Sequence, residues 1–592
     1  MPVKALIVAS AAAVAIALPA LAQQSVQPQP APAPANQYPN GGIGAAAPQP
    51  AAAAPSAATP SRSSGPADDS AVQEVAAASL RPSAPPVEYP GWSRRDPAIV
   101  GSLDPADIGI GADAFGSSSG AFLSTLMRRM DVPLASRWAH IALRDALLAR
   151  IQAPTQVNPV DWVAERAWLL LRMGEADAAR MLIAGVDTDQ ATPKLVQVGV
   201  QTALATADAP ALCPLEPGIR RYDKNIVQLV QAMCAALAGE PESASAQIDR
   251  ARRYGRIGGI DLVLAEKLVG AAANTRSVTV EWEPVESLTA WRFGLASATG
   301  LLPPDRLINA ASPQLRAFQA RAPMLTAQQR LPSAFIAAGL GVFSSQTMVD
   351  LYSSIYDSTD PDALPSSDAW QLRQAYVAKD QATRLASVRR LLAFGKGPLG
   401  KEGARALAAR AATLIVPDPA LAADAPELIS AMLAGGYDEA AARWIPAVNR
   451  MDSAQADRCW AMLALAGPNI AEIGSGRVAS FIRRDKSPGQ VRSALLVAGL
   501  AGLGRITQDS ANSLNRRYGF GLGRTTRWTR IIDAAAARRQ PGTVLVLTGT
   551  GFQTTSVDQL PASHVYHAIA ALHLTGQDFT ARMIAAEALS RT

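Results

Sequence analysis

The chain has 592 residues, of which 49% are hydrophobic and only 5% aromatic, and its formal net charge is +6. This length exceeds what one compact core usually supports, so several domains or one extended array is expected. Alanine supplies much of the apolar content, and because alanine is the best helix former, the composition favours an all-α fold over a β-rich core.

The first 22 residues match the pattern of a secretory signal peptide. Lys4 gives a short positive region, an uncharged apolar stretch follows and is broken by Pro19, and Ala20-Leu21-Ala22 supplies a cleavage site. The alternative is an uncleaved anchor, because the apolar stretch approaches the length of a membrane span. We expect cleavage and a periplasmic or secreted protein. No later segment has the roughly 20 apolar residues of a membrane helix, so no transmembrane helix is expected after cleavage.

Residues 23–115 are expected to form a disordered tether rich in proline, alanine and glutamine. The stretch Pro-Gln-Pro-Ala-Pro-Ala-Pro at 28–34 is typical of it. Large apolar side chains are almost absent from its first part, so nothing offsets the entropy of ordering the backbone. Two interpretations remain open, a spacer that reaches across an envelope and a low-complexity tail without a function.

From residue 116 to the C-terminus the apolar residues follow a 3.6-residue period, which predicts consecutive helices. Asn158 and Pro159 form a cap and first-turn proline for one of them, and Asp350, Asp424 and Asp452 indicate further helix starts. We expect N-terminal helical repeats over 116–275 and C-terminal helical repeats over 276–592.

Four helix-like runs end in a glycine that is followed five positions later by an alanine. The pairs are Gly174 and Ala179, Gly239 and Ala244, Gly436 and Ala441, and Gly576 and Ala581. A glycine that ends one helix and a small residue buried in the next allow a helical hairpin to close tightly. Its repetition along one chain predicts a helical-hairpin solenoid.

Two of these turns, Gly-Glu-Ala-Asp-Ala-Ala at 174–179 and Gly-Tyr-Asp-Glu-Ala-Ala at 436–441, resemble the turn inside tetratricopeptide repeats. In that family a glycine closes the first helix and an alanine five residues later packs beneath it. The copies are not spaced at multiples of 34 residues, so the resemblance is to degenerate repeats. It implies stacked helix pairs with a concave surface for protein or peptide ligands.

Two stretches depart from the helical pattern. Residues 277–282 alternate Val278, Val280 and Trp282 at period two, which is typical of a short strand or an extended connector. Residues 543–547 form a small β-branched run between two glycines. Neither has enough neighbours for a sheet, and the first marks a junction between the two halves of the array.

Three cysteines suit an exported protein with one disulfide. Cys213 and Cys234 flank a turn-rich stretch between two helical runs, and we expect them to pair, the alternative being two buried thiols. Cys459 lies in an apolar helix and is expected in the core.

The sequence offers no convincing catalytic residue, cofactor site or metal site. Residues 116–120 fit G-x-S-x-G, but the strand that feeds a nucleophile elbow is missing. His564, His567 and His573 are close in sequence, yet the first and last point to opposite sides of one helix. We therefore expect an ordinary helix start in the first case and separate surface or capping histidines in the second.

The basic segment 477–539 holds 13 Lys and Arg against three Asp, a local charge of +10. Its centre consists of five arginines and two aromatic residues: Arg516, Arg517, Arg524, Arg527, Arg530, Tyr518 and Trp528. Arginine suits bidentate binding of phosphate or carboxylate, so these residues are a candidate anion-binding site. The alternative is a solvated face whose arginine stems cover the core.

Together these features predict a non-enzymatic periplasmic scaffold or regulator of cell-envelope machinery. Its expected partners are envelope proteins or an anionic glycan or lipid, and no nucleic acid is expected because the chain is exported. The alternative is a peptidoglycan- or polysaccharide-acting enzyme with an accessory helical array. That class needs a lysozyme-like domain with a catalytic glutamate, for which the sequence shows no signature.

Overall fold

The computed structural model describes residues 90–274, 278–468 and 470–592. The expected signal peptide (1–22) and most of the expected tether lie outside them. The chain divides into two compact units, and everything below concerns the unit that contains Arg95–Thr592. No strand occurs among the described residues, which are predominantly α-helical, and Leu103 and Ala149 form an isolated parallel bridge.

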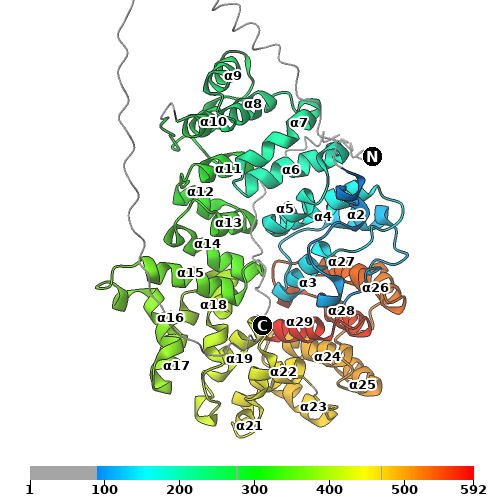
Figure 1. Cartoon of the computed structure of the whole chain (residues 1–592). Coiled ribbons are helices and arrows are strands. Elements are labelled where there is room, and N and C mark those ends of the chain that lie inside the picture. The colour runs from blue at the N-terminus through cyan, green and yellow to red at the C-terminus, as the bar shows by residue number, and fades with distance from the viewer. Residues whose placement is uncertain (1–89, 275–277, 469) are drawn as a thin grey trace, which may run out of the picture. The chain divides into compact units, whose positions relative to one another are not determined.

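Figure 1 shows the helices in chain order. The first group is α2 (Gly120–Arg129), α3 (Arg137–Leu148), α4 (Pro159–Met173), α5 (Ala176–Ala184), α6 (Pro193–Ala205), α7 (Glu216–Tyr222), α8 (Val227–Leu237), α9 (Pro241–Tyr254) and α10 (Gly259–Ala272). The second group is α11 (Ala290–Ala298), α12 (Asp305–Ala310), α13 (Pro313–Arg321), α14 (Ala327–Leu340), α15 (Ser345–Ser358), α16 (Asp368–Val377), α17 (Gln381–Ala393), α18 (Gly397–Ala412) and α19 (Ala425–Ala434). The third group is α20 (Asp438–Ala442), α21 (Ile445–Val448), α22 (Ser453–Ala466), α23 (Ser475–Arg484), α24 (Val491–Gly502), α25 (Gln508–Tyr518), α26 (Arg527–Ala537), α27 (Pro541–Gly551), α28 (Ala562–Leu574) and α29 (Asp578–Ser590).

Side-chain caps start several helices where the sequence indicated them. Asn158 Oδ1 accepts from the backbone N–H groups of Val160 and Asp161, and Asp452 accepts from that of Ala454. The other two aspartates behave differently. Asp424 precedes α19 without a capping bond, and Asp350 lies inside α15, whose cap is Ser344. The prediction of a helix start at Asp350 was wrong, because Ser344, six residues earlier, already accepts from a backbone N–H of the first turn.

The four glycine turns each join two helices, as predicted. All four glycines are left-handed, with φ between +81° and +96°, and the alanine five positions later is fully buried in each case. In each turn the N–H of the next residue bonds back to the carbonyl five positions earlier, as Glu175 does to Leu170 at 2.8 Å. This bond satisfies an end carbonyl of the first helix and fixes the angle at which the second helix leaves. The fold is therefore all-helical and repeat-like.

The β-branched run at 543–547 belongs to a helix and is not an extended segment. It lies in α27, where every residue from Pro541 to Gly549 is buried. A helix that is apolar on all sides is surrounded by other helices, and a short apolar run cannot be distinguished from a buried strand by its period. Residues 278–289, by contrast, do form a non-helical connector between α10 and α11.

The folded part begins earlier than the composition suggested. Residue 115 was the expected end of the tether, but Arg95 already belongs to the folded unit. Val100, Ile110 and Phe115 are buried, and the Phe115 ring meets Trp162 edge to face at 5.1 Å. Two short 3₁₀ turns, Pro97–Ile99 and Pro105–Ile108, lie in this stretch.

The last helices pack against the first ones. α3 contacts α27 and α29, and α2 contacts α27 (Figure 1). In a linear solenoid each repeat contacts only its neighbours, so the first and last repeats would not meet. The folded unit therefore departs from a simple linear stack. No helix of the described part is long and apolar enough to cross a membrane.

Candidate functional site

The predicted anion-binding arginines lie on α25, α26 and the glycine-rich loop between them. We call this set, Arg516, Arg517, Arg524, Arg527 and Arg530, the arginine surface. All five side chains are exposed, and none forms an ion pair with a carboxylate of the described residues. Arginines without a carboxylate partner on a short stretch of surface can meet an anionic ligand without first breaking an ion pair.

The loop between α25 and α26 is held by its own backbone and side chains. Asn515 Oδ1 accepts from the N–H of Leu522, which is buried, and Thr526 forms a reciprocal capping box with Thr529 at the start of α26. Gly519 and Gly521 have φ of +72° and +71°, which allows the chain to reverse without strain. The backbone that carries Arg524 is therefore held in a fixed conformation.

The two predicted aromatic residues have different positions. Tyr518 stacks on Phe520 at 5.6 Å, and the Arg517 guanidinium lies 5.4 Å from the Tyr518 ring centre, so Tyr518 lies beside the arginine surface. Trp528 is turned inward. Its Nε1 donates to Leu547 O at 2.8 Å and its ring packs on His564, which gives it a packing role.

Several other basic residues of 477–539 are engaged in the fold. Arg477 and Arg484 both pair with Asp457, at 2.8 and 2.6 Å. Arg505 is buried and donates to the carbonyls of Ala464 and Gly467, and burial lowers its pKa from 12.5 to about 10. The local charge of +10 therefore overstates the positive charge available to a ligand, which is concentrated after residue 515.

A pocket of about 120 Å³ is lined in part by Leu522 and Gly523 of the loop that carries Arg524. Tyr566 and His567 form part of its wall. His567 Nδ1 lies 2.8 Å from Asp533 Oδ1, so this aspartate, the nearest acidic residue in sequence to the arginines of α26, is already paired. Asp533 therefore forms no ion pair with an arginine of α26.

The structure joins Cys213 and Cys234 in a disulfide, with their Cα atoms 5.6 Å apart. The bond links the 3₁₀ segment Ala209–Leu215 to α8. Cys459 is buried and unpaired, and burial raises the pKa of its thiol to about 12.

The remaining chemical candidates are separated or engaged in packing. His564 Nδ1 meets Gly551 O, His567 meets Asp533 and His573 meets Asp578, so each histidine has its own partner. No group of three potential metal ligands occurs among the described residues. In the G-x-S-x-G stretch, Ser118 Oγ bonds to Gln540 and Thr543, which attaches the loop to the start of α27.

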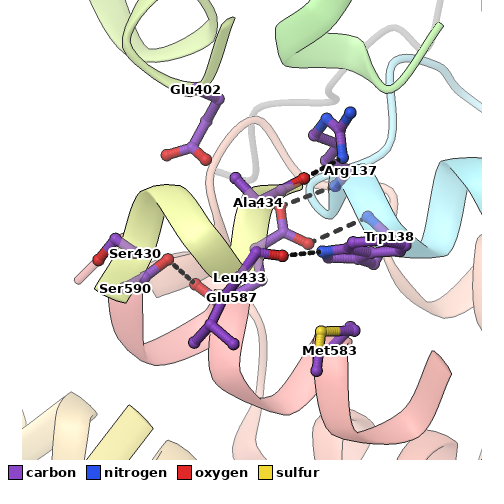
Figure 2. A pocket seen from close by; sticks show the side chains of 9 residues that line it. All are labelled: Arg137, Trp138, Glu402, Ser430, Leu433, Ala434, Met583, Glu587 and Ser590. Carbon is purple, nitrogen blue, oxygen red and sulfur yellow. Dashed lines mark hydrogen bonds between the residues drawn. The ribbon is translucent and has the colours of Figure 1, made fainter. Parts of the chain in front are cut away.

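The sequence did not indicate a buried polar centre at the start of α3 (Figure 2). The Arg137 guanidinium donates to the carbonyls of Ala338 (2.8 Å), Ala434 (2.7 Å) and Phe343 (3.2 Å). Burial lowers its pKa from 12.5 to about 10, although Glu587 and Glu402 oppose that shift. The side chain satisfies carbonyl groups at the ends of α14 and α19, so its role is to bind helix ends together.

Glu587 of α29 caps α3 from outside. Its carboxylate accepts from the Arg137 N–H (2.8 Å), the Trp138 N–H (3.1 Å) and Ser136 Oγ (2.5 Å), and it pairs with Arg591 at 2.8 Å. A void of about 10 Å³, the size of one water molecule, remains among these groups. A cavity of this size holds no substrate, so the polar centre is structural.

α3 also contacts the glycine turns. Trp138 Nε1 donates to Leu433 O in the turn before Gly436, and the Trp138 ring meets Phe579, near Gly576, at 5.4 Å. His140 Nε2 lies 3.0 Å from Glu175, which follows Gly174. Three of the four turns found in the sequence therefore contact one helix. In the sequence, the only sign of this arrangement is that polar residues interrupt the otherwise apolar run that forms α3.

Comparison with known proteins gave no match: no protein-family model, curated protein or solved structure is similar to this chain.

Proposed function

We propose that the chain is a non-enzymatic, exported helical-repeat scaffold of the cell envelope that binds an anionic envelope ligand through the arginine surface. The observation that carries the proposal is the exposure of five arginines without a carboxylate partner on α25, α26 and the loop between them. Export rests on the signal pattern of residues 1–22, and the scaffold role rests on the hairpin series.

The contrast with other surface arginines supports the proposal. Arg180, Arg220 and Arg389, all on other helices, pair with Asp208, Glu216 and Asp424 at 2.6 to 2.7 Å. Such pairs reduce the charge that a ligand meets. The arginine surface keeps its charge, and Tyr518 adds an aromatic face beside Arg517. The combination suits carboxylate or phosphate groups carried on sugars or lipids.

Charge reversal on one side of the loop tests the proposal. The variant R524E/R527E/R530E changes three exposed side chains, and R129E/R390E/R410E is the matched control because those arginines are also exposed and form no ion pair with a described residue. The probes are polygalacturonate, an anionic polysaccharide, and vesicles that contain phosphatidylglycerol. At about 1 kcal/mol for each basic residue near an anionic surface, the first variant is expected to bind roughly 100-fold more weakly at low salt.

The wild-type protein and the control variant should bind equally well and lose affinity as salt rises. Equal loss of binding in both variants would show that only net charge matters and would refute a local site. Salt-insensitive binding that survives R524E/R527E/R530E would refute the proposal as well.

A further inference from the structure

The tetrapeptide Arg-Arg-Tyr-Gly occurs twice, at Arg252–Gly255 and at Arg516–Gly519. Both copies close a helix. α9 ends at Tyr254 with Gly255 as its C-cap, and α25 ends at Tyr518 with Gly519 as its C-cap. Two arginines in the last turn of a helix, followed by tyrosine and glycine, therefore form the same local element at two places in the folded unit. Their caps differ, since Gly519 is left-handed and Gly255 is extended.

The first copy, like the second, presents an unpaired arginine and a tyrosine at its surface. Tyr254 is 80% exposed, and Arg253 and Arg256 are exposed and form no ion pair with a described residue. Arg252 is the exception, because it pairs with Glu266 of α10. We call Arg253, Tyr254 and Arg256 the α9 corner.

Glycine-rich loops follow both copies. Gly259, Gly519 and Gly521 have positive φ, so the backbone itself favours glycine there. A Cβ atom added at any of these three, at Gly258 after α9 or at Gly523 after α25 would meet nothing within 4 Å, so no side chain covers the backbone beside the adjacent arginines.

The two copies are separate in space. α9 contacts α8 and α10, whereas α25 contacts α24 (Figure 1). No side chain is shared between them, so each copy can bind on its own. Because both belong to one compact unit, their separation is set by the fold. A ligand that reaches both gains the effective concentration of a bivalent contact.

We propose that the α9 corner is a second anion-binding site of the same kind as the arginine surface, and that one chain of an anionic polysaccharide spans both sites. The inference rests on the proposed function. A polysaccharide is favoured over a lipid surface because a flexible polymer can follow the protein between two separated sites. Moreover, Tyr254 is a single exposed ring and does not form an apolar cluster that inserts into a membrane.

The test compares a short and a long probe on the full chain. Tetragalacturonate is too short to bridge separate sites, so calorimetry should give two bound molecules per protein. R253E/R256E should reduce that number to one. Long polygalacturonate should bind the wild-type protein more tightly than either site alone allows, and R253E/R256E should lower this affinity by roughly 100-fold.

R390E/R410E is the matched control, because both arginines are exposed and lie in the last turns of α17 and α18, as Arg253 does in α9. It should leave the stoichiometry at two. Far-UV circular dichroism and the thermal midpoint verify that both variants are folded, and Arg253→Gln with Arg256→Gln provides a milder pair should the glutamate variant misfold.

Three outcomes overturn the inference, and they can be told apart. In the first outcome, the wild-type protein binds one tetragalacturonate, which R524E/R527E/R530E loses and R253E/R256E keeps. This result leaves the proposed function intact and excludes the second site. In the second outcome, both variants still bind tetragalacturonate as the wild-type protein does, which refutes both proposals. Binding to phosphatidylglycerol vesicles that depends on both sites, without binding to polygalacturonate, refutes the choice of a polysaccharide.

Discussion

Replacing Glu587 with alanine should loosen the contact between the last helix and the first ones. The carboxylate is almost fully buried and accepts four hydrogen bonds, two of them from backbone N–H groups at the start of α3. Its removal leaves those two backbone donors without a partner, and Arg591 keeps its bond to Ala135 O but loses its ion-pair partner at 2.8 Å. Breaking a buried ion pair costs about 3–5 kcal/mol, and each orphaned buried donor about 1–3 kcal/mol.

These costs do not add in full, because the variant opens room for water. The existing void of about 10 Å³ grows by the volume of the lost side chain, and water there can bind some of the freed donors. We therefore expect a loss of about 4 kcal/mol in the free energy of opening this region. Glu587→Gln retains one acceptor oxygen and should lie between the wild-type protein and Glu587→Ala.

Hydrogen exchange by mass spectrometry measures this effect locally. A loss of about 4 kcal/mol corresponds to exchange roughly a thousandfold faster for peptides that cover α3 and α29. Peptides from α17, which is distant in sequence from both, are the internal reference. Glu439→Ala is the control variant, since Glu439 is an exposed first-turn residue of α20 whose loss should cost less than about 1 kcal/mol. Equal exchange in α3 for the two variants would refute the role we give to Glu587.

Two further predictions concern the core. A Cβ at Gly339 would lie 2.0 Å from Leu399 O, so Gly339→Ala should lower the free energy of unfolding in urea by about 3 kcal/mol. The control Gly476→Ala, in an open part of α23, should stabilise slightly. Equal effects of the two substitutions would contradict the close approach of α14 and α18. Burial raises the pKa of Cys459 from 9.0 to about 12, so its thiolate fraction near pH 8.5 should be about a thousandfold lower in the folded chain, and iodoacetamide should label it only after unfolding. Rapid labelling of the native protein would contradict the burial of Cys459. Because folding raises this pKa, the contribution of the thiol to stability is complete below about pH 9 and is lost as pH rises from 9 to 12.

The hairpin turns were predictable because their requirement is local. A left-handed residue after a helix favours glycine, and the alanine five positions later must fit beneath the first helix, so both leave a signature in sequence. The same turn also occurs at Ala207 and Arg539, which have φ of +52°. There Leu212 and Val544 occupy the buried position five residues later. A search for glycine and alanine could not find these turns, because non-glycine residues adopt the same backbone at a modest cost.

The available charge of the basic segment could not be read from its sequence. Counting residues 477–539 gives +10, yet Arg477, Arg484 and Arg505 are bound inside the fold by groups outside the segment or by carbonyls. Whether an arginine is free depends on which helix packs beside it, and that is a property of the tertiary structure. For the same reason Trp528 was assigned to the ligand site although it packs on α27 and α28.

The polar centre explains why a repeat-like chain does not remain a linear stack. An apolar face on α3 would pack against any neighbouring helix with little preference, whereas Arg137 and Glu587 are satisfied only when the ends of α14 and α19 and the side of α29 are all in place. A buried charge without its partners is strongly unfavourable, so this requirement selects one arrangement of segments that are hundreds of residues apart. The glycine turns supply similar hairpins along the chain, and the charged residues of α3 decide which of them meet. Local geometry therefore accounts for the repeats, and the specific contacts of one polar helix account for how they are assembled.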